Sequence, residues 1–417
     1  MSERYFAAYN RLVSLSNLEL VWSHTTKATL EVSLERMRQL LKRLGNPEKA
    51  MEYVHVTGTS GKGSVTYLLH EILRRGGEKV ASYSSPHTTT FLERFRIDDK
   101  LAHPDALAHA IEDILAAHEE HMRAGHDPLT YYELSTCTAF LLFQRAGVNW
   151  CVLEVGLGGR YDATNVIPAP VVAVITNIDL DHTELLGPTK IHIAKEKAGI
   201  IKPGCLVVTG ETEAGPLKVI SAEAKKAKAP LLVIPNDMDD HLEHNADICR
   251  AAGLLLGASP LLIELAIESS SPLPCRLEII QENPRVIIDG AHNGAKMRAT
   301  IAHLKHMRKG KVHVIFGCKH LKDAETMTGE IANIASSVRT TRFTLGYGKP
   351  ENPVKLLQRF PKKMQKRAFL FPHDALADAL KTAKKSDTIL ITGSLYLSGE
   401  LRTHWRSEKM ILKDRRS

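Results

Sequence analysis

The stretch Val54-His-Val-Thr-Gly-Thr-Ser-Gly-Lys-Gly-Ser64 decides the fold of this chain. It is a short apolar run that leads into a glycine-rich turn, and the residues after the turn show apolar side chains at helical spacing up to Arg75. The glycines let backbone amides approach an anion closely, and the N-terminus of the following helix points its positive end at the same place. The stretch therefore predicts a strand, a phosphate-binding loop and a helix, which together form a building unit of a parallel α/β sheet.

The spacing of this loop differs from that of the common P-loop. In the common form, four residues separate the two glycines and the lysine directly precedes Ser or Thr. Here two residues separate Gly58 from Gly61, and Gly63 stands between Lys62 and Ser64. We expect Lys62 to lie on the phosphates and Ser64 to lie near a magnesium ion, in a phosphate loop of a distinct kind.

Length and composition indicate a globular protein with more than one domain. The chain has 417 residues, of which 43% are hydrophobic and 24% are charged. It contains no apolar run of the roughly 18 residues that span a bilayer, and its first residues lack the order of a secretion signal. We therefore expect a cytoplasmic protein with no membrane partner. The six cysteines show no CxxC spacing, so we expect buried free thiols rather than disulfides or a zinc site.

The net charge of +8 raises the question of nucleic-acid binding. Basic clusters occur at residues 362–367 and 413–416. They contain no interleaved aromatic residues, and aromatic residues make up only 6% of the chain. Because single-stranded nucleic acid is bound largely by stacking on aromatic side chains, we expect a solvated basic face or attraction for polyanionic small molecules, and no nucleic-acid partner.

Apolar runs that end in glycine or a polar residue recur along the chain with helical segments between them, which predicts two α/β domains. Strands are expected at residues 51–57, 150–155, 171–176 and 206–209, and again from 277, 285, 311 and 387. A segment rich in Ser and Pro, from Glu268 to Pro274, interrupts the pattern. We predict a nucleotide-binding domain over 1–267 with a mostly parallel sheet, a linker over 268–275, and a smaller Rossmann-like α/β domain over 276–417.

Polar residues directly follow several of these apolar runs, at the carboxyl ends of strands where parallel sheets bind ligands. They are Glu154 after the second strand, Asp179, Asp181 and His182 after the third, and Asp289 and His292 after the strand from 285. Carboxylates and imidazole beside a phosphate loop suit one or two hard cations, with magnesium or manganese favoured when phosphate oxygens complete the shell. Taken singly, Glu154 is equally typical of a turn cap and His182 of an ordinary loop histidine.

Two further segments are ordinary by pattern alone. The run Lys195-Glu196-Lys197 before Gly199 is typical of a charged helix C-terminus. The segment Ser84-Ser-Pro-His87 is typical of a turn. Neither indicates a functional site until it is considered together with the rest of the chain.

Several of these segments, taken together and in order, resemble the motifs of a known family. They are Gly58-Thr-Ser-Gly-Lys-Gly-Ser64, Ser84-Ser-Pro-His87 with Glu93-Arg-Phe-Arg96, Leu153 to Asn165, Asp181 to Gly187, Glu196 to Ile200, Asp289-Gly-Ala-His-Asn293 and Thr392-Gly-Ser-Leu-Tyr396. They resemble the motifs of folylpolyglutamate synthase and dihydrofolate synthase, members of the Mur ligase superfamily, over nearly the whole chain. The resemblance implies a Mur-ligase-like N-terminal ATPase domain and an ATP-dependent ligase, in which a carboxylate is phosphorylated and the acyl phosphate is attacked by the amine of L-glutamate.

The resemblance also implies roles for individual residues. ATP is expected at Gly58, Thr59, Gly61, Lys62, Gly63 and Ser64, with Asn245 and Arg276. Mg²⁺ is expected at Ser85, Glu154 and His182, with Ser64 close by. Lys197 matches a lysine that becomes carbamylated beside a second metal, and Asp289 and His292 match residues that hold the incoming amino acid. The residues expected to take part in catalysis are Lys62, His182, Lys197 and Arg276, the last when the two domains close.

Some positions depart from the family pattern. Between Thr209 and Asn245 the chain is shorter than is usual, Gly294 replaces a common proline, and Cys275 replaces the usual glycine before Arg276. The acid substrate therefore stays open between dihydropteroate, a folate, or both, and we expect a monomer. The alternatives are a Mur-type ligase that joins another amino acid to another carboxylate, and a nucleotide-binding protein without catalysis. Ser84 to His87 and Thr130-Tyr-Tyr-Glu133 favour the folate branch, and Lys62 and Lys197 argue against lost catalysis.

Overall fold

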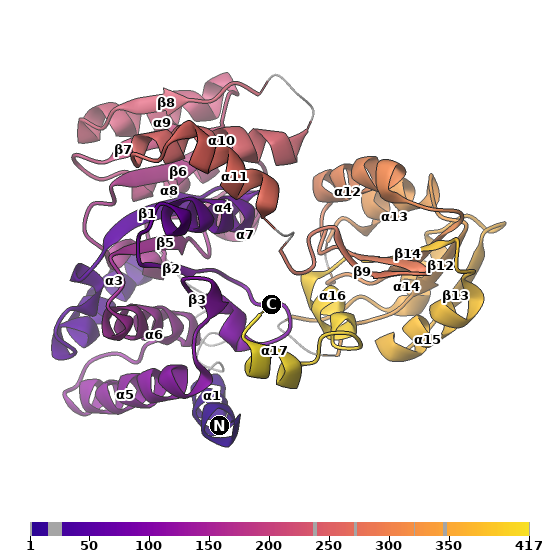
Figure 1. Ribbon diagram of the computed structural model, residues 1–417, viewed down its shortest axis with the longest axis horizontal. Coiled ribbons are helices and arrows are strands. Elements are labelled where there is room, and N and C mark those ends of the chain that lie inside the picture. Colours follow the sequence, from indigo (N-terminus) through magenta and orange to yellow (C-terminus); the bar gives the residue numbers. More distant parts are fainter. Residues whose placement is uncertain are drawn as a thin grey trace. The chain divides into compact units, whose positions relative to one another are not determined.

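The computed structural model describes residues 2–15, 27–236, 240–270, 273–320, 322–344 and 348–416. The chain divides into two compact units (Figure 1). Unit 1 contains Met1–His87 and Phe91–Ser270, and unit 2 contains Ser271–Arg415 together with the short segment Thr88–Thr90. Glu268 and Ser269, where the predicted linker begins, lie in the last turn of helix α11 (Pro260–Ser269).

Unit 1 is built on a sheet that has eight strands among the described residues, in the order β4-β3-β2-β5-β1-β6-β7-β8. The strands are β1 (Glu52–Thr57), β2 (Val80–Tyr83), β3 (Phe95–Ile97), β4 (Lys100–Leu101), β5 (Trp150–Glu154), β6 (Val172–Ile175), β7 (Leu206–Thr209) and β8 (Leu231–Val233). Strand β3 pairs antiparallel with both β2 and β4, and all other neighbours pair in parallel. The predicted mostly parallel α/β sheet is confirmed.

Helices cover both faces of this sheet. The helices of unit 1 are α1 (Ser2–Ser14), α3 (Lys27–Arg43), α4 (Lys62–Arg75), α5 (Pro104–Arg123), α6 (Tyr131–Ala146), α7 (Thr183–Leu186), α8 (Lys190–Lys197), α9 (Ala214–Ala227), α10 (His241–Leu255) and α11. Alternate side chains of a strand point to opposite faces. Thus Val172 and Val174 pack with α4, α10 and α11, while Ala173 and Ile175 pack with α8 and α9. Figure 1 shows α10 and α11 lying beside α4.

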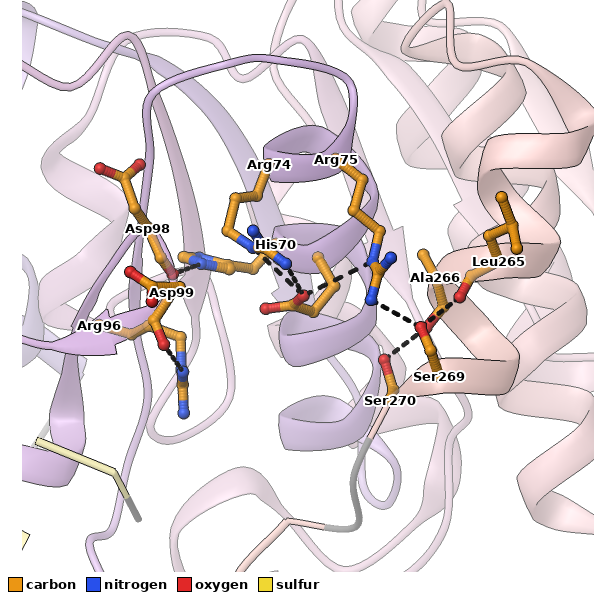
Figure 2. A network of polar contacts seen from close by, with 11 residues as sticks. His70, Arg74, Arg75, Arg96, Asp98, Asp99, Leu265, Ala266, Ser269 and Ser270 are labelled. Atoms are coloured by element: carbon orange, nitrogen blue, oxygen red, sulfur yellow. Dashed lines mark hydrogen bonds and ion pairs between the residues drawn. The ribbon is translucent and has the colours of Figure 1, made fainter. Parts of the chain in front are cut away.

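Figure 2 shows polar contacts that fix the helix after the phosphate loop. His70 of α4 lies with Nε2 2.8 Å from the Asp98 carbonyl oxygen in the turn between β3 and β4. One turn on, Arg75 donates from Nη2 to Ser269 Oγ of α11 at 2.6 Å and lies 3.9 Å from the Glu71 carboxylate. The C-terminal half of α4 is therefore tied to two neighbouring segments of unit 1, while its N-terminus carries the loop.

Unit 2 contains a sheet with six strands among the described residues, in the order β13-β12-β11-β14-β10-β9. Its elements are β9 (Glu278–Glu282), β10 (Arg285–Ile288), α12 (Gly294–Met307), β11 (Val312–Phe316), α13 (Ala324–Ala332), β12 (Ser337–Thr340), α14 (Pro353–Gln358), β13 (Gln365–Ala368), α15 (Pro372–Thr382), β14 (Thr388–Thr392), α16 (Leu395–Arg402) and α17 (Glu408–Asp414). Only β9 pairs antiparallel within this described sheet. Helices α12 and α13 pack on one face and α15 and α16 on the other, as a Rossmann-like domain requires.

Two further sequence features can be located in the structure. All six cysteines are buried and none is in a disulfide, as the absence of CxxC spacing predicts. Among the helices of the described ranges, none combines the length and apolar character of a membrane span.

Candidate active site

The glycine-rich loop at the end of β1 has the conformation that the sequence predicts. Gly58 has φ +150° and Gly61, which caps α4, has φ +82°. A Cβ atom on Gly58 would lie 1.8 Å from Thr176 Oγ1, and one on Gly61 would lie 2.3 Å from Asn245 Oδ1. Both positions therefore require glycine because of close approach as well as backbone conformation.

The segment after β6 holds this loop in place. Thr59 donates from its backbone N to the Asn177 carbonyl oxygen at 3.0 Å, and Ser60 N donates to Asn177 Oδ1 at 2.9 Å. Thr176 Oγ1 donates to the Ser60 carbonyl oxygen at 2.5 Å, and the Asp179 amide donates to Thr59 Oγ1 at 2.9 Å. The conformation of the loop is thus set by residues far away in sequence.

Two lysines converge on the first residue of the loop. Lys62, the first residue of α4, donates from Nζ to the Gly58 carbonyl oxygen at 2.9 Å. Lys197, the last residue of α8, donates from Nζ to the same oxygen at 2.8 Å and is only 4% exposed. Two ammonium groups around one loop create a strongly positive environment for an anion. Gly63 and Ser64 follow Lys62 in the first turn of α4.

A carboxylate lies at the end of the neighbouring strand. Glu154 ends β5, is paired in register with Val56 of β1, and is 5% exposed. Its Oε2 atom accepts a hydrogen bond of 3.3 Å from the Ser85 amide. The structure therefore brings together Ser85 and Glu154, which are far apart in sequence.

His182 lies on the segment that continues from Asp179. It has φ +50° and precedes the short helix α7. Its side chain is 46% exposed, with Nε2 3.9 Å from the Asp181 carboxylate and Nδ1 3.7 Å from that of Glu184. Since Asp179 is hydrogen-bonded to Thr59, the structure connects the His182 segment to the phosphate loop.

Asn245 reaches the phosphate loop from α10. It is 7% exposed, and its Oδ1 atom occupies the space beside Gly61 that a Cβ atom would need. The structure therefore places Asn245 directly beside the phosphate loop.

The sequence-predicted residues of unit 2 gather at the carboxyl end of β10. The Asp289 carboxylate accepts hydrogen bonds from Thr300 Oγ1 at 2.7 Å and from the Ala291 and Leu277 amides at 2.9 and 3.1 Å. A Cβ atom on Gly290 would lie 3.0 Å from Nη1 of the exposed Arg276. Arg276 and Asp289 therefore lie close together within this unit.

The contacts of His292 fix its tautomer. Its Nε2 atom lies 3.0 Å from Lys296 Nζ, and its Nδ1 atom lies 2.9 Å from the Gly290 carbonyl oxygen. Because an ammonium group can only donate and a carbonyl oxygen can only accept, Nε2 is the acceptor and Nδ1 carries the proton. The neutral ring thus makes both contacts without a change of protonation.

Sequence reasoning did not select Tyr132 and Asp162, although both lie in segments with family resemblance. The Asp162 carboxylate accepts from the Leu157 and Thr164 amides at 2.9 Å each and lies 3.4 Å from the Tyr132 hydroxyl. Burial raises the pKa of Asp162, and burial followed by the Asp162 charge raises the pKa of Tyr132 well above its ordinary value. The Tyr132 side chain also forms a hydrogen bond with the Ser85 side chain. The signal in the sequence that could have identified Asp162 was its place in the loop that follows β5.

The donor set of unit 1 fits a hard divalent cation. Glu154 supplies a buried carboxylate, Ser64 and Ser85 supply hydroxyl groups, and His182 supplies an imidazole nitrogen. Magnesium is commonly bound through one or two carboxylates while phosphate oxygens and water complete its shell. The residues present therefore suit Mg²⁺ or Mn²⁺ bound together with a nucleotide.

Comparison with known families gives a consistent assignment for both units. Residues 56–248 match the family model of the Mur ligase middle domain, and residues 275–395 match that of the Mur ligase glutamate ligase domain. The first of these ranges contains the phosphate loop, and the second contains Asp289 and His292.

Two relatives extend the similarity over almost the whole chain. The chain is 30% identical over 422 residues to a dihydrofolate synthase/folylpolyglutamate synthase of Bacillus subtilis, covering 91% of this chain and 97% of that protein. It is 31% identical over 409 residues to a probable bifunctional folylpolyglutamate synthase/dihydropteroate synthase of Haloferax volcanii, covering 89% of this chain but only 48% of that longer protein.

Solved structures show the same architecture with ligands. Escherichia coli FolC in complex with DHPP and ADP has a TM-score of 0.80 at 30% identity, with 98% of each chain covered. A bifunctional folylpolyglutamate synthase/dihydrofolate synthase of Yersinia pestis, complexed with AMPPNP and a Mn ion, has a TM-score of 0.78 at 27% identity, with 94% of this chain and 97% of that chain covered.

Proposed function

Because the chain belongs to the dihydrofolate synthase/folylpolyglutamate synthase family of Mur ligases, we propose that it joins L-glutamate to a pterin carboxylate. The acid is dihydropteroate, a folate, or both, and ATP drives the ligation. The observation that carries the proposal is the convergence of Lys62 and Lys197 on the Gly58 carbonyl, beside the Glu154 carboxylate at the end of the next strand.

The reaction has two balanced steps. In the first, an oxygen of the acid's carboxylate attacks the γ-phosphorus of ATP, the bond from that phosphorus to the bridging oxygen breaks, and ADP leaves. In the second, the amine nitrogen of L-glutamate attacks the carbonyl carbon of the acyl phosphate, the carbon–oxygen bond breaks, phosphate leaves and the nitrogen loses a proton. Both steps depend on holding negatively charged groups close together, which positioned cations and amides make possible.

The nucleotide is assigned to the loop of unit 1. Within the loop from Gly58 to Ser64, the amides of Gly61 and Gly63 bind the phosphates and Lys62 neutralises their charge, while Thr59, whose amide donates to Asn177, fixes the loop beside the nucleotide. Asn245 is assigned to the nucleotide because it lies against Gly61. Arg276 is assigned to the same ligand by family resemblance.

The metal ligands are assigned to Ser85, Glu154 and His182, with Ser64 beside the triphosphate. Mg²⁺, when bound, neutralises charge on the phosphate oxygens during transfer. Glu154 is held by the Ser85 amide, so the two ligands are oriented before an ion arrives. A second Mg²⁺ is assigned near Lys197, which in its carbamylated form carries a carboxylate-like group.

The amino acid is assigned to unit 2. Asp289 is fixed by Thr300 and by two backbone amides, and His292 is fixed by Gly290 and Lys296. Because Asp289 is held in this way, its carboxylate can accept from the ammonium group of the amino acid without rearrangement, and His292 is assigned to the same ligand by family resemblance. We accordingly assign residues 1–267 to an ATP-binding domain, 268–275 to a linker and 276–417 to a domain that binds L-glutamate. We further propose that the protein is a cytoplasmic monomer whose only partners are small molecules.

The test is an assay of ADP release by the purified protein. Release that requires both L-glutamate and either dihydropteroate or tetrahydrofolate supports the proposal, and mass spectrometry of the products distinguishes single from repeated glutamate addition. Release with another amino acid and another carboxylate would instead support a different Mur-type ligase. No release with any pair would support a nucleotide-binding protein without catalysis.

A further inference from the structure

Arg94 is a buried cation that no carboxylate contacts in the described part of the chain. It ends the short helix η3 (Phe91–Arg94), precedes β3 and is 5% exposed. Its guanidinium carbon lies 5.6 Å from the centroid of the Phe91 ring and 5.7 Å from that of Tyr131. Removing a cation from water is costly, and aromatic faces compensate only in part. The cost of burying Arg94 therefore indicates that this residue has a specific role.

Arg94 contacts both ends of one short segment. The Ser84 amide donates to the Arg94 carbonyl oxygen at 3.1 Å. The Arg94 side chain donates from Nε to His87 Nδ1 at 3.0 Å. Between these two attachment points lies Ser85, whose amide donates to the Glu154 carboxylate. One arginine therefore fixes the segment that presents Ser85 to Glu154.

The same contact fixes the state of His87. An arginine Nε always carries hydrogen, so Nδ1 of His87 is the acceptor and the ring proton lies on Nε2. The Nδ1 atom of the His87 ring therefore serves as the acceptor for Arg94.

We propose that Arg94 is a positioning residue of the ligase, which holds Ser84 to His87 so that Ser85 and Glu154 together form one side of the metal site. This inference rests on the proposed function, in which both residues bind the divalent ion. A residue that only filled space beside Phe91 and Tyr131 would affect stability and leave metal binding unchanged.

The test measures Mn²⁺ binding to the full chain in the presence of ADP, by the loss of the free-ion signal in electron paramagnetic resonance. We expect Arg94→Met to weaken Mn²⁺ binding by about 10- to 100-fold, as is usual when the support of a metal ligand is removed. In a Ser85→Ala background the same change should add little, because the ligand that Arg94 positions is already absent. The proposal would be overturned if the Arg94→Met protein bound Mn²⁺ as tightly as the wild type, or if the losses in Mn²⁺ affinity caused by Arg94→Met and Ser85→Ala were fully additive.

Arg96 provides a matched control two residues further on. Its guanidinium carbon also lies over an aromatic ring, 5.2 Å from the Tyr67 centroid, and it donates to the Asp99 carbonyl oxygen. Arg96→Met should leave Mn²⁺ binding unchanged. If Ser85→Ala alone binds Mn²⁺ normally, the metal role of Ser85 is wrong; if Ser85→Ala weakens binding and Arg94→Met does not, only the role of Arg94 is wrong.

A second variant covers the case in which Arg94→Met does not fold. His87→Phe keeps an aromatic ring beside Phe91, whose centroid lies 5.9 Å from that of His87, and removes the acceptor of Arg94 Nε. We expect it to weaken Mn²⁺ binding about tenfold, and to remain folded with a lower melting temperature because the buried Arg94 Nε loses its acceptor. A folded His87→Phe protein with wild-type Mn²⁺ binding would contradict the positioning role.

Discussion

Lys62 and Lys197 donate hydrogen bonds to the same acceptor, the carbonyl oxygen of Gly58. One lysine begins the helix after the phosphate loop and the other ends α8, 135 positions later in the printed numbering. Two ammonium groups repel each other, so a negatively charged ligand such as the proposed triphosphate, or the proposed carbamylation of Lys197, would stabilise this arrangement.

Replacing Lys62 with Met should lower kcat by about 100- to 1000-fold, because it removes a positioned cation from the phosphoryl group being transferred. The Lys62 side chain is partly exposed, so the melting temperature of the variant should change little. The measurement is the rate of ADP release. Lys79→Met is the matched control, since the exposed Lys79 also donates to a backbone carbonyl, that of Ala146, away from the loop. A Lys62→Met enzyme with normal kcat would refute the assignment.

Activity should depend on bicarbonate if Lys197 is carbamylated. In that reaction the neutral amine nitrogen of Lys197 bonds to the carbon of CO2 and releases a proton. We expect enzyme depleted of CO2 to lose most of its activity and to recover it with bicarbonate, and intact mass spectrometry to detect one added CO2.

Lys202 is the control for this second prediction. Burial, and then the Arg38 charge, lower the pKa of Lys202 to about 8, so this amine loses its proton more easily than an ordinary lysine. It donates to the Asn165 and Ile167 carbonyl oxygens. Lys202→Met should keep the bicarbonate response and Lys197→Met should abolish it; the reverse result would exclude Lys197 as the modified residue.

Gly61→Ala should impair catalysis far more than Gly45→Ala. Both glycines have φ +82°, so both substitutions cost about 1 kcal/mol in backbone strain. No atom lies within 4 Å of a Cβ on Gly45, whereas a Cβ on Gly61 meets Asn245 Oδ1 at 2.3 Å. Displacing the loop by ~1 Å should cost about 100-fold in kcat/KM. Equal effects of the two variants on kcat/KM would show that strain alone matters here.

Unfolding of the chain at acid pH should depend on His70. Burial lowers its pKa from 6.5 to about 4. Between pH 6.5 and about 4, His70 therefore binds fewer protons in the folded state than in the unfolded state. The stability that neutral His70 contributes is complete above pH 6.5 and is lost as the pH falls through about 4. It amounts to about 3 kcal/mol of the free energy of unfolding.

Urea unfolding between pH 4 and 7 measures this effect. His70→Gln, which retains a donor for the Asp98 carbonyl, should lose less stability on acidification than the wild type. His109→Gln, at an exposed position of α5, should follow the wild-type curve. Parallel curves for His70→Gln and the wild type would show that other groups cause the acid sensitivity.

Most of the strands that were predicted from the sequence have long apolar runs. β1, β5, β6, β7, β10, β11 and β14 lie within a residue or two of their expected positions, because each is largely buried in a parallel sheet. The strand expected from residue 277 is β9, which begins at Glu278 and is only partly buried. β13 (Gln365–Ala368) and β8 (Leu231–Val233) were not predicted, since they are edge strands with only partly buried side chains. The antiparallel strands β3 and β4 are too short to give a periodic signal.

The sequence by itself determined the two-domain α/β architecture, the phosphate loop and the strand-end acids, because these depend on local apolar runs, glycine spacing and family motifs. Only the tertiary structure decided which residues meet: Lys197 with Gly58, Ser85 with Glu154, Asn245 with Gly61, and Arg94 with His87. These contacts join segments whose relation depends on strand order and helix packing. No local pattern encodes that relation, because side chains at the carboxyl ends of neighbouring strands become neighbours only when the sheet has formed.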